Sequence, residues 1–262
     1  MLMMEQLIFD THAHYNDEAF DEDREAVLSG LRAAGIGTVV NICSDLKSIP
    51  ETLKLLEDYP WMYGAAGIHP SDCGPLNEEN FRVVTEAFKH PRMVAVGEIG
   101  LDYYWDTPER EIQKKWFERQ LQLAREIKKP VSIHSRDAAQ DTLEIMKAHK
   151  CEEIGGVIHC FSYGIDMARE YLNRGFYLGI GGVLTYKNGK KLKEVVAYAP
   201  MDRLVLETDC PYLSPVPFRG KRNSSANLPY VVAEMAALKG LTPEAVIEQT
   251  CRNARALYRL EQ

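Results

Sequence analysis

The chain has 262 residues, with 31 Lys and Arg against 38 Asp and Glu, which gives a formal net charge of −7. Hydrophobic residues make up 45% and charged residues 26%, a composition typical of a globular protein with a sizeable core and not of a disordered or fibrous chain. The acidic balance argues against a surface that coats nucleic acid broadly, but it leaves room for a local phosphate site beside bound cations.

The cellular compartment is inferred from the first residues and the cysteines. No apolar run is long enough to span a bilayer, and the start, MLMMEQLIFD, lacks the basic segment of a secretion signal. None of the six cysteines forms a C-x-x-C pair, so we expect reduced thiols. We therefore expect a cytoplasmic protein without membrane association, and we expect it to be a monomer.

Short apolar segments alternate with helical patterns along the whole chain. Eight segments are predicted to be strands: 7–12, 38–43, 62–68, 93–99, 130–135, 155–160, 176–181 and 203–208. Their continuous apolar character favours parallel strands covered on both faces. The clearest helix is predicted over 107–129, with Thr107 as its cap and Pro108 at the next position.

Eight β-α units in about 250 residues have the size of a (β/α)8 TIM-like barrel. Two more helices, over 224–240 and 242–260, are predicted to pack on that barrel. A doubly wound open sheet is the alternative, but it would need a glycine-rich first turn that grips phosphate, and DTHAHYNDEAF is not one. No linker is evident, so residues 1–262 are predicted to form one barrel domain.

Polar side chains stand at the ends of several predicted strands, where barrels gather their chemistry. His12 and His14 end the first strand, and residues two apart on a strand point to the same side, so both imidazoles can share one cation. Four more such groups end the fourth, fifth, sixth and eighth strands: Glu98, His134, His159 and Asp209.

Each of these residues alone has an ordinary structural explanation, since a strand-end histidine is often a satisfied structural residue and an isolated H-x-H is a weak signal. The joint pattern is different, because buried carboxylates and imidazoles need partners. Six ligands exceed what one tetrahedral zinc ion takes. Two divalent cations bridged by a carboxylate fit better, and such sites suit displacement at phosphorus or at a carbonyl carbon.

The chain resembles the TatD family of metal-dependent hydrolases, within the amidohydrolase-like barrels. The motifs that carry the resemblance span nearly the whole sequence: DTHAH, GIHP, VGEIGLDY, HSRDA, HCFS, LETDCPYLSPVPFRGKRN and NARALY. The family has a (β/α)8 fold and includes divalent-cation-dependent deoxyribonucleases, some of them 3′-to-5′ exonucleases.

The resemblance implies two metals joined by one carboxylate: His12, His14 and Asp209 on one, His134 and His159 on the other, and Glu98 as the bridge. A carbamylated lysine, found in some related enzymes, is not implied, because the position on the fourth strand is a glutamate. By analogy with related barrels, Asp209 is also the expected proton acceptor. The alternative for Asp209 is a ligand role alone.

Two more acidic residues precede ligands by two positions. Asp10 and Glu207 are predicted to face inward and to orient ligating imidazoles through hydrogen bonds, with a buried salt bridge as the alternative. The sequence also departs from the family pattern, with Ser224 and Ser225 where a proline is common and Tyr163 where a glycine is common. Both departures bear on the loops expected to contact substrate.

Several loop residues are candidate substrate contacts, each with a structural alternative. His69 could bind phosphate or assist the leaving group, and Arg136 is placed to bind a phosphate oxygen. The loop after the eighth strand is basic, where barrels frequently bind phosphate, through Arg219, Lys221 and Arg222. Aromatic residues in the loops after the fourth and sixth strands could stack on bases or pack within the loops: Tyr103, Tyr104, Trp105, Phe161 and Tyr163.

The sequence therefore predicts a two-metal hydrolase that acts on ester bonds, with single-stranded DNA as the expected substrate. The same site could instead cleave an amide or another ester, such as an aminoacyl ester on tRNA, and a metal-binding scaffold without catalysis is a further alternative. Four imidazoles suit Zn²⁺ or Mn²⁺ better than Mg²⁺, while the resemblance is to enzymes often assayed with Mg²⁺.

Overall fold

The structure is a computed structural model, and it describes residues 7–260. Eight strands form one sheet in sequence order: β1 (Ile8–Ala13), β2 (Ile36–Ile42), β3 (Met62–Ala66), β4 (Met93–Asp102), β5 (Val131–Arg136), β6 (Gly156–Ile158), β7 (Tyr177–Ile180) and β8 (Leu204–Leu206). Every neighbouring pair is parallel. The predicted TIM-like barrel is confirmed, and the doubly wound alternative is wrong, because its strand order would not follow the sequence.

The barrel is nearly closed where β8 returns to β1. The contact is a single parallel bridge between Ala13 and Cys210. Main-chain hydrogen bonds support it from His14 N to Cys210 O (2.8 Å) and from Asp209 N to His12 O (2.9 Å). The seam of the barrel therefore runs directly beneath the H-x-H segment and Asp209.

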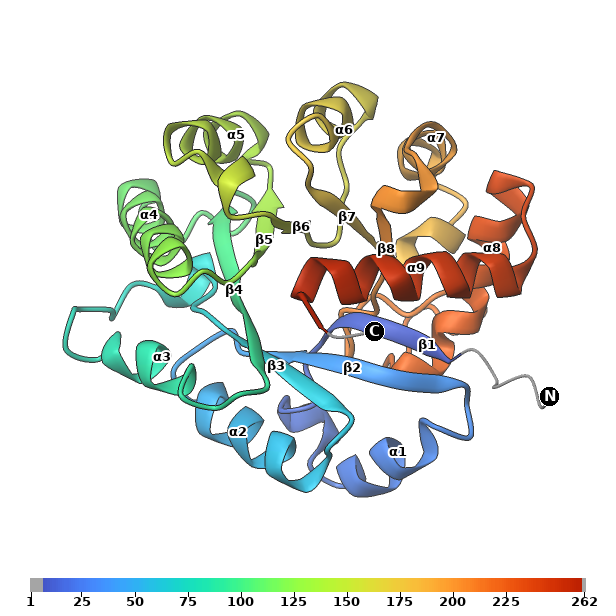
Figure 1. Cartoon of the computed structure of the whole chain (residues 1–262), viewed down its shortest axis with the longest axis horizontal. Helices are drawn as coiled ribbons and strands as arrows, with labels where there is room; N and C mark the ends of the chain where they lie inside the picture. The colour runs from blue at the N-terminus through green and yellow to red at the C-terminus, as the bar shows by residue number, and fades with distance from the viewer. Residues whose placement is uncertain (1–6, 261–262) are drawn as a thin grey trace.

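Helices surround the strands in Figure 1: α1 (Arg24–Gly30), α2 (Ser48–Asp58), α3 (Arg82–Ala87), α4 (Arg110–Glu126), α5 (Ala139–Ala148), α6 (Ile165–Leu172), α7 (Lys190–Tyr198), α8 (Leu228–Lys239) and α9 (Pro243–Tyr258). The predicted start of α4 at Thr107 is wrong. Glu109 is extended, with φ −48° and ψ 142°, so α4 begins at Arg110. The Gln113 side chain donates to the main-chain oxygens of Pro108 and Asp102 and accepts from Asp102 N. These hydrogen bonds connect the end of β4 to α4.

The second C-terminal helix, α9, covers the interior of the barrel, and Figure 1 shows it crossing in front of β8 and β1. Its apolar residues Leu257 and Tyr258 pack in one cluster with Phe9 and other strand residues. Asn253 donates to the main-chain oxygens of Met201 and Leu204, and the Tyr258 hydroxyl donates to Thr11 O. The predicted packing of the C-terminal helices on the barrel is confirmed.

The sequence predicts that the chain has no membrane span and that its cysteines are reduced, and residues 7–260 bear on both expectations. Over that range, no helix is long and apolar enough to cross a membrane. All six cysteines lie within the described range and are free thiols, four of them buried. The opening residues used for the secretion argument lie largely outside the described range.

Candidate metal centre

The first group of candidate ligands forms at the end of β1. The Nε2 atoms of His12 and His14 point to the same place and lie 3.1 Å apart. Asp209 Oδ1 lies 3.4 Å from His14 Nε2 and 3.8 Å from His12 Nε2. These three residues offer ligand atoms within 4.8 Å of one another, which is the spacing of a shared cation.

The second group forms across β4, β5 and β6. Glu98 Oε1 lies 2.9 Å from His134 Nδ1 and 3.6 Å from His159 Nε2, while its other oxygen lies 3.4 Å from His12 Nε2. The two oxygens of Glu98 thus face the two groups of imidazoles. Gly100 makes this possible, because a Cβ at its φ of +142° would lie 1.9 Å from His134 O, so only glycine lets β4 approach β5 so closely.

In three of the imidazoles, an oxygen atom faces the ring nitrogen that points away from the site. This oxygen determines which nitrogen of the neutral ring carries the proton. His14 Nδ1 faces Ile42 O at 3.0 Å, and His134 Nε2 faces Asp102 Oδ2 at 2.9 Å. His159 Nδ1 lies 3.2 Å from Glu207 Oε2, and neither of these buried atoms makes a hydrogen bond in the described chain, so this ion-pair contact is their partner. Because these oxygens only accept, each ring in its neutral form holds its proton on the nitrogen away from the site, and its other nitrogen is then available to bind a cation.

The charge states at the site suit a cation as well. Burial, with the neighbouring His159 ring, lowers the pKa of His12 to about 4, so His12 is a neutral ligand. Burial opposes ionisation of Glu98, but the surrounding imidazoles of His159, His12 and His134 hold its pKa well below the usual value. The pKa of Asp209 is lowered in the same way, against its burial, by His14 and His159. Against their burial, the same carboxylates with Asp102 and Glu207 raise the pKa of His14 and His134, and that of His159 to about 10, so these rings hold protons that a bound cation would displace. The donor set of imidazoles and anionic carboxylates fits two divalent cations.

Asp102 is a functional residue that sequence reasoning missed. It is buried at the last position of β4, and Oδ2 pairs with His134 while Oδ1 accepts from the main-chain N–H groups of Tyr104 and Trp105 at 3.0 Å each. The available signal was its position in GEIGLDY, four residues after Glu98 and hence on the same side of the strand. Imidazole ligands commonly donate their other N–H to such a carboxylate.

The prediction that Asp10 orients an imidazole is wrong. Its carboxylate accepts from the main-chain N–H of His12 (3.1 Å), from Thr208 N and Oγ1 (3.1 and 2.7 Å) and from Ser225 Oγ (2.6 Å). Two of these partners, Thr208 and Ser225, lie after β8, so the Asp10 side chain bonds across the seam between β1 and the segment after β8. Asp10 therefore joins the two strands that close the barrel. Glu207, in contrast, lies beside a ligand imidazole, with Oε2 3.2 Å from His159 Nδ1, and its orienting role stays a prediction.

Ser225, which departs from the family pattern, also bonds at the seam, because its hydroxyl donates to Asp10. Its hydroxyl is fully buried and, besides Asp10, contacts the Tyr15 hydroxyl at 2.8 Å. Ser225 thus belongs to the polar network at the seam and does not face the substrate. At the other departure, the Tyr163 hydroxyl contacts Ser135 Oγ at 2.9 Å and accepts from Ala138 N at 3.3 Å, which ties the loop after β6 to the loop after β5.

His69 lies beside the second ligand group, with its ring centroid 4.4 Å from that of His134. Its Nδ1 accepts from the main-chain N–H of Ser71 at 3.2 Å, so a neutral ring carries its proton on Nε2. Burial, together with the charge of His134, lowers the pKa of His69 to about 4, which keeps the ring neutral. The Nε2–H lies 3.9 Å from Glu98 Oε1, at the edge of the site, as a hydrogen-bond donor.

The other candidate substrate contacts differ in how free their side chains are. The Tyr103 hydroxyl donates to Asp141 at 2.7 Å, and the Arg110 guanidinium lies over its ring. Arg136 is exposed, and its guanidinium lies 3.8 Å from the Tyr104 ring centroid. Tyr103 is therefore held in a structural cluster, whereas Arg136 remains accessible to a phosphate.

The basic residues after β8 are likewise not equivalent. Arg222 donates to both carboxylate oxygens of Asp23, at 2.8 and 2.6 Å, so its charge is compensated and it ties this loop to the segment after β1. Arg219 is exposed and lies over the Tyr186 ring at 4.4 Å, and Lys221 is exposed. Arg219 and Lys221 are the residues of this loop best placed to meet an anion.

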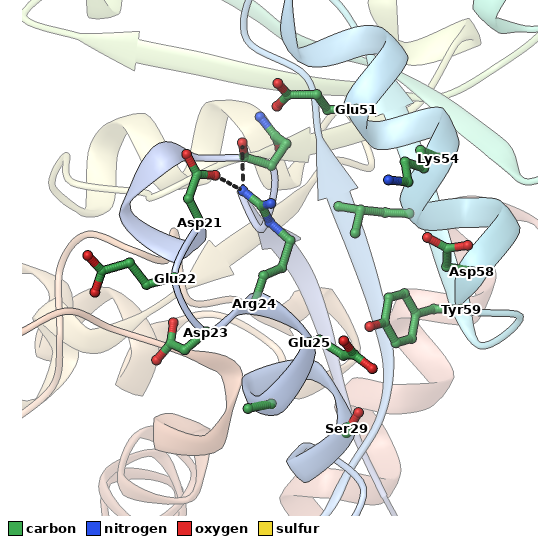
Figure 2. Close-up of a pocket in the computed structure, with 13 residues that line it drawn as sticks. Asp21, Glu22, Asp23, Arg24, Glu25, Ser29, Glu51, Lys54, Asp58 and Tyr59 are labelled. Carbon is green, nitrogen blue, oxygen red and sulfur yellow. Dashed lines mark hydrogen bonds and ion pairs between the residues drawn. The ribbon is translucent and has the colours of Figure 1, made fainter.

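A separate hollow lies between α1 and α2, away from the ligand groups (Figure 2). Arg24 in its wall is bound to Asp21 Oδ1 at 2.6 Å and to main-chain oxygens. Most of the charged lining is acidic: Asp21, Glu22, Asp23, Glu25, Glu51 and Asp58. Such a lining repels phosphate, so we do not assign nucleic acid to this hollow.

Comparisons with known proteins agree with this architecture. A family model described as TatD related DNase matches residues 9–259. The metal-dependent hydrolase YabD of Bacillus subtilis is 42% identical over 97% of this chain and 100% of its own length. The 3′-5′ ssDNA/RNA exonuclease TatD of Salmonella typhimurium is 30% identical over 96% of this chain and 98% of its own. The crystal structure of YJJV, a TatD homologue from Escherichia coli, superposes with a TM-score of 0.92 at 30% identity and covers 99% of this chain and 100% of that one.

A parallel eight-stranded barrel whose strand ends gather imidazoles and carboxylates, together with curated relatives that are metal-dependent hydrolases over nearly the whole chain, places this protein in the class of metal-dependent hydrolases. Within that class, the chain belongs to the TatD family, as the family model and the curated relatives show over nearly its whole length. The resemblance found in the sequence is confirmed.

Proposed function

We propose that this protein is a two-metal nuclease that hydrolyses phosphodiester bonds of single-stranded DNA, working from the 3′ end. The observation that carries the proposal is the set of four imidazoles gathered around Glu98 and Asp209, three of them with an oxygen partner behind the ring. The description of the family model as a DNase, and of the Salmonella relative as a 3′-5′ ssDNA/RNA exonuclease, supports the choice of substrate.

The two carboxylates are proposed to have different roles because their exposures differ. The Glu98 side chain is 5% exposed and lies between the ligand groups, which suits a bridging ligand. The Asp209 side chain is 18% exposed, so water reaches it, and we assign it as ligand and as the acceptor of the proton from the attacking water. Bound divalent cations would supply neutralisation of the phosphate charge and a more acidic water.

His69 and the neighbouring cations are proposed to bind the phosphate. The Nε2–H of His69 is placed to donate to a phosphate oxygen, because its Nδ1 is occupied by Ser71. Arg136, Arg219 and Lys221 surround the ends of β5 and β8 and give a local positive region on an acidic protein. Such a region would draw a polyanionic strand to the ligand groups.

The proposal extends to the identity of the cation, the cellular compartment and the oligomeric state. Four imidazoles favour Zn²⁺ or Mn²⁺ over Mg²⁺ as the resident cation. Free cysteines are consistent with a cytoplasmic protein. We further propose that the whole chain acts as one catalytic domain and as a monomer.

The test uses purified protein stripped of metal with a chelator and then supplied with Mg²⁺, Mn²⁺ or Zn²⁺. Single strands labelled at the 3′ or the 5′ end report the direction of cleavage, and a duplex of the same sequence serves as comparison. We expect stepwise shortening from the 3′ end with at least one metal, and no shortening in chelator. Asp209→Asn should lower turnover by about a hundredfold to ten-thousandfold, the usual contribution of a general base, while retaining bound metal.

Two results would contradict the proposal. Cleavage of an aminoacyl ester or of a small amide, with nucleic acid left intact under every metal, would assign the site to another ester or amide. Absence of stoichiometric metal together with absence of all hydrolysis would favour a scaffold. Near-normal turnover in Asp209→Asn would refute only the assignment of the proton acceptor.

A further inference from the structure

Two large aromatic side chains directly follow β4 and remain in water. Trp105 is 65% exposed and Tyr104 is 55% exposed, and their ring centroids lie 5.2 Å apart at an interplanar angle of 86°. Adjacent aromatic rings gain free energy when they are covered, so an exposed pair beside a functional site suggests an aromatic ligand. A guanidinium also lies against the pair, that of Arg136 over the Tyr104 ring.

The aromatic pair is held in a fixed position relative to the candidate metal ligands. One oxygen of Asp102 accepts from the main-chain N–H groups of Tyr104 and Trp105, and the other pairs with His134 Nε2. His134 in turn faces Glu98 through Nδ1 at 2.9 Å. One buried carboxylate therefore positions both a ligand imidazole and the turn that carries the exposed rings.

We propose that Tyr104 and Trp105 form a stacking platform for an unpaired nucleobase next to the phosphate that is cleaved, with Asp102 as the residue that positions the platform. This inference rests on the proposed nuclease function and adds the feature that selects single strands. A π-face accepts any base, so the platform binds without sequence preference, whereas paired bases in a duplex are already stacked and cannot reach it. Arg136 then adds a cation beside the same nucleotide.

Among the aromatic residues that the sequence suggests for stacking, Tyr103 and Tyr163 are less suited to it. Their hydroxyl groups are bonded to Asp141 and to Ser135, and neither ring is among the exposed large hydrophobic side chains. Stacking on a base needs an open ring face, and Trp105 provides the most exposed one of the four. The platform is therefore assigned to the neighbouring pair instead.

The first experiment measures kcat/KM of the double variant Tyr104→Ala/Trp105→Ala on a labelled single strand and on the same strand with an abasic residue near its 3′ end. Loss of a base stack of about 1–3 kcal/mol corresponds to a fall of about fivefold to hundredfold, at about 1.4 kcal/mol per tenfold. We expect that fall on the intact strand and less than a twofold change on the abasic strand. Tyr198→Ala, at the far end of α7 and 45% exposed, is the matched control and should change neither.

The second experiment measures binding without turnover, in an Asp209→Asn background. Trp105 is the exposed one among the three tryptophans, so a stacked base should quench the intrinsic fluorescence, and Trp105→Phe should remove the quenching. Asp102→Asn keeps an oxygen for the two N–H groups and should preserve quenching while weakening the pairing with His134. Asp102→Ala should lose both the fluorescence quenching and the pairing with His134. A merely structural role for Asp102 would give the same result in both variants.

The outcomes separate this inference from the proposed function. If the wild-type protein cleaves single strands and the double variant cleaves them equally well, the platform is refuted and the nuclease function stands. If strands quench Trp105 but are never cleaved under any metal, the platform stands and the nuclease function fails. If strands neither bind nor react, both are refuted.

Discussion

Glu207 gives the sharpest test of how the ligand lone pairs are directed. Its side chain is fully buried, with Oε2 3.2 Å from His159 Nδ1 and Oε1 accepting from Cys160 N at 2.5 Å. The space is shaped for this side chain, because a Cβ on Gly179 would lie 2.1 Å from Glu207 Oε2. The substitution Glu207→Gln preserves the shape and the bond to Cys160 but presents an amide N–H to the imidazole.

The His159 ring must then accept through Nδ1, so its proton moves to Nε2, the atom that faces Glu98 and Asp209. The lone pair that a cation needs is lost. Changes behind a ligand imidazole typically cost about tenfold to hundredfold in metal affinity, which corresponds to about 1.4–2.8 kcal/mol. We expect a loss of this size for the more weakly bound of the two cations.

The assay is competition for Zn²⁺ or Mn²⁺ against a chromogenic chelator, with thermal unfolding in excess chelator to separate metal affinity from stability. Glu194→Gln, an exposed position on α7, is the control and should bind metal like the wild type. Unchanged affinity for both cations in Glu207→Gln would refute the argument that the partner of Nδ1 directs the Nε2 lone pair of His159.

Three further predictions test the seam between β1 and β8, the hydrogen bonds of α9 and the proposed phosphate contact of His69. Asp10→Ala removes a buried acceptor of four hydrogen bonds, from His12 N, Thr208 N, Thr208 Oγ1 and Ser225 Oγ, and leaves Thr208 only longer contacts to His12 O and Ser225 only the Tyr15 hydroxyl. At about 0.5–1.5 kcal/mol for each bond, urea unfolding should show a loss of about 3 kcal/mol; the same change at Asp166, whose side chain is 97% exposed, should cost almost nothing. Asn253→Ala removes the bonds of α9 to the main chain around β8 and should lower the unfolding free energy by about 1–3 kcal/mol, and an unchanged urea midpoint would mean that α9 is held by apolar packing alone. His69→Ala removes a donor to an anionic oxygen worth about 1.5–3 kcal/mol and should lower kcat/KM by about tenfold to 150-fold with metal content unchanged; a loss of metal instead would make His69 a ligand.

The sequence determined the architecture and the places of the chemical groups. Apolar segments at the spacing of βα units defined eight parallel strands, and the strand boundaries fall within a few residues of those expected. The six strand-end residues come together because parallel strands of a barrel all end at one face. These features depend on periodicity and chain order, which a sequence displays directly.

The tertiary structure decided what the supporting residues do. Asp10 and Glu207 look alike in the sequence, since each stands two residues before a ligand, but Asp10 bonds Thr208 and Ser225 at the seam while Glu207 lies 3.2 Å from His159 Nδ1. The position of Asp102 four residues after Glu98 was only a weak signal, and its contact with His134 appears when β4 and β5 are paired. Side-chain direction and partner identity depend on strand register and on contacts across long sequence separations, and local pattern does not encode these.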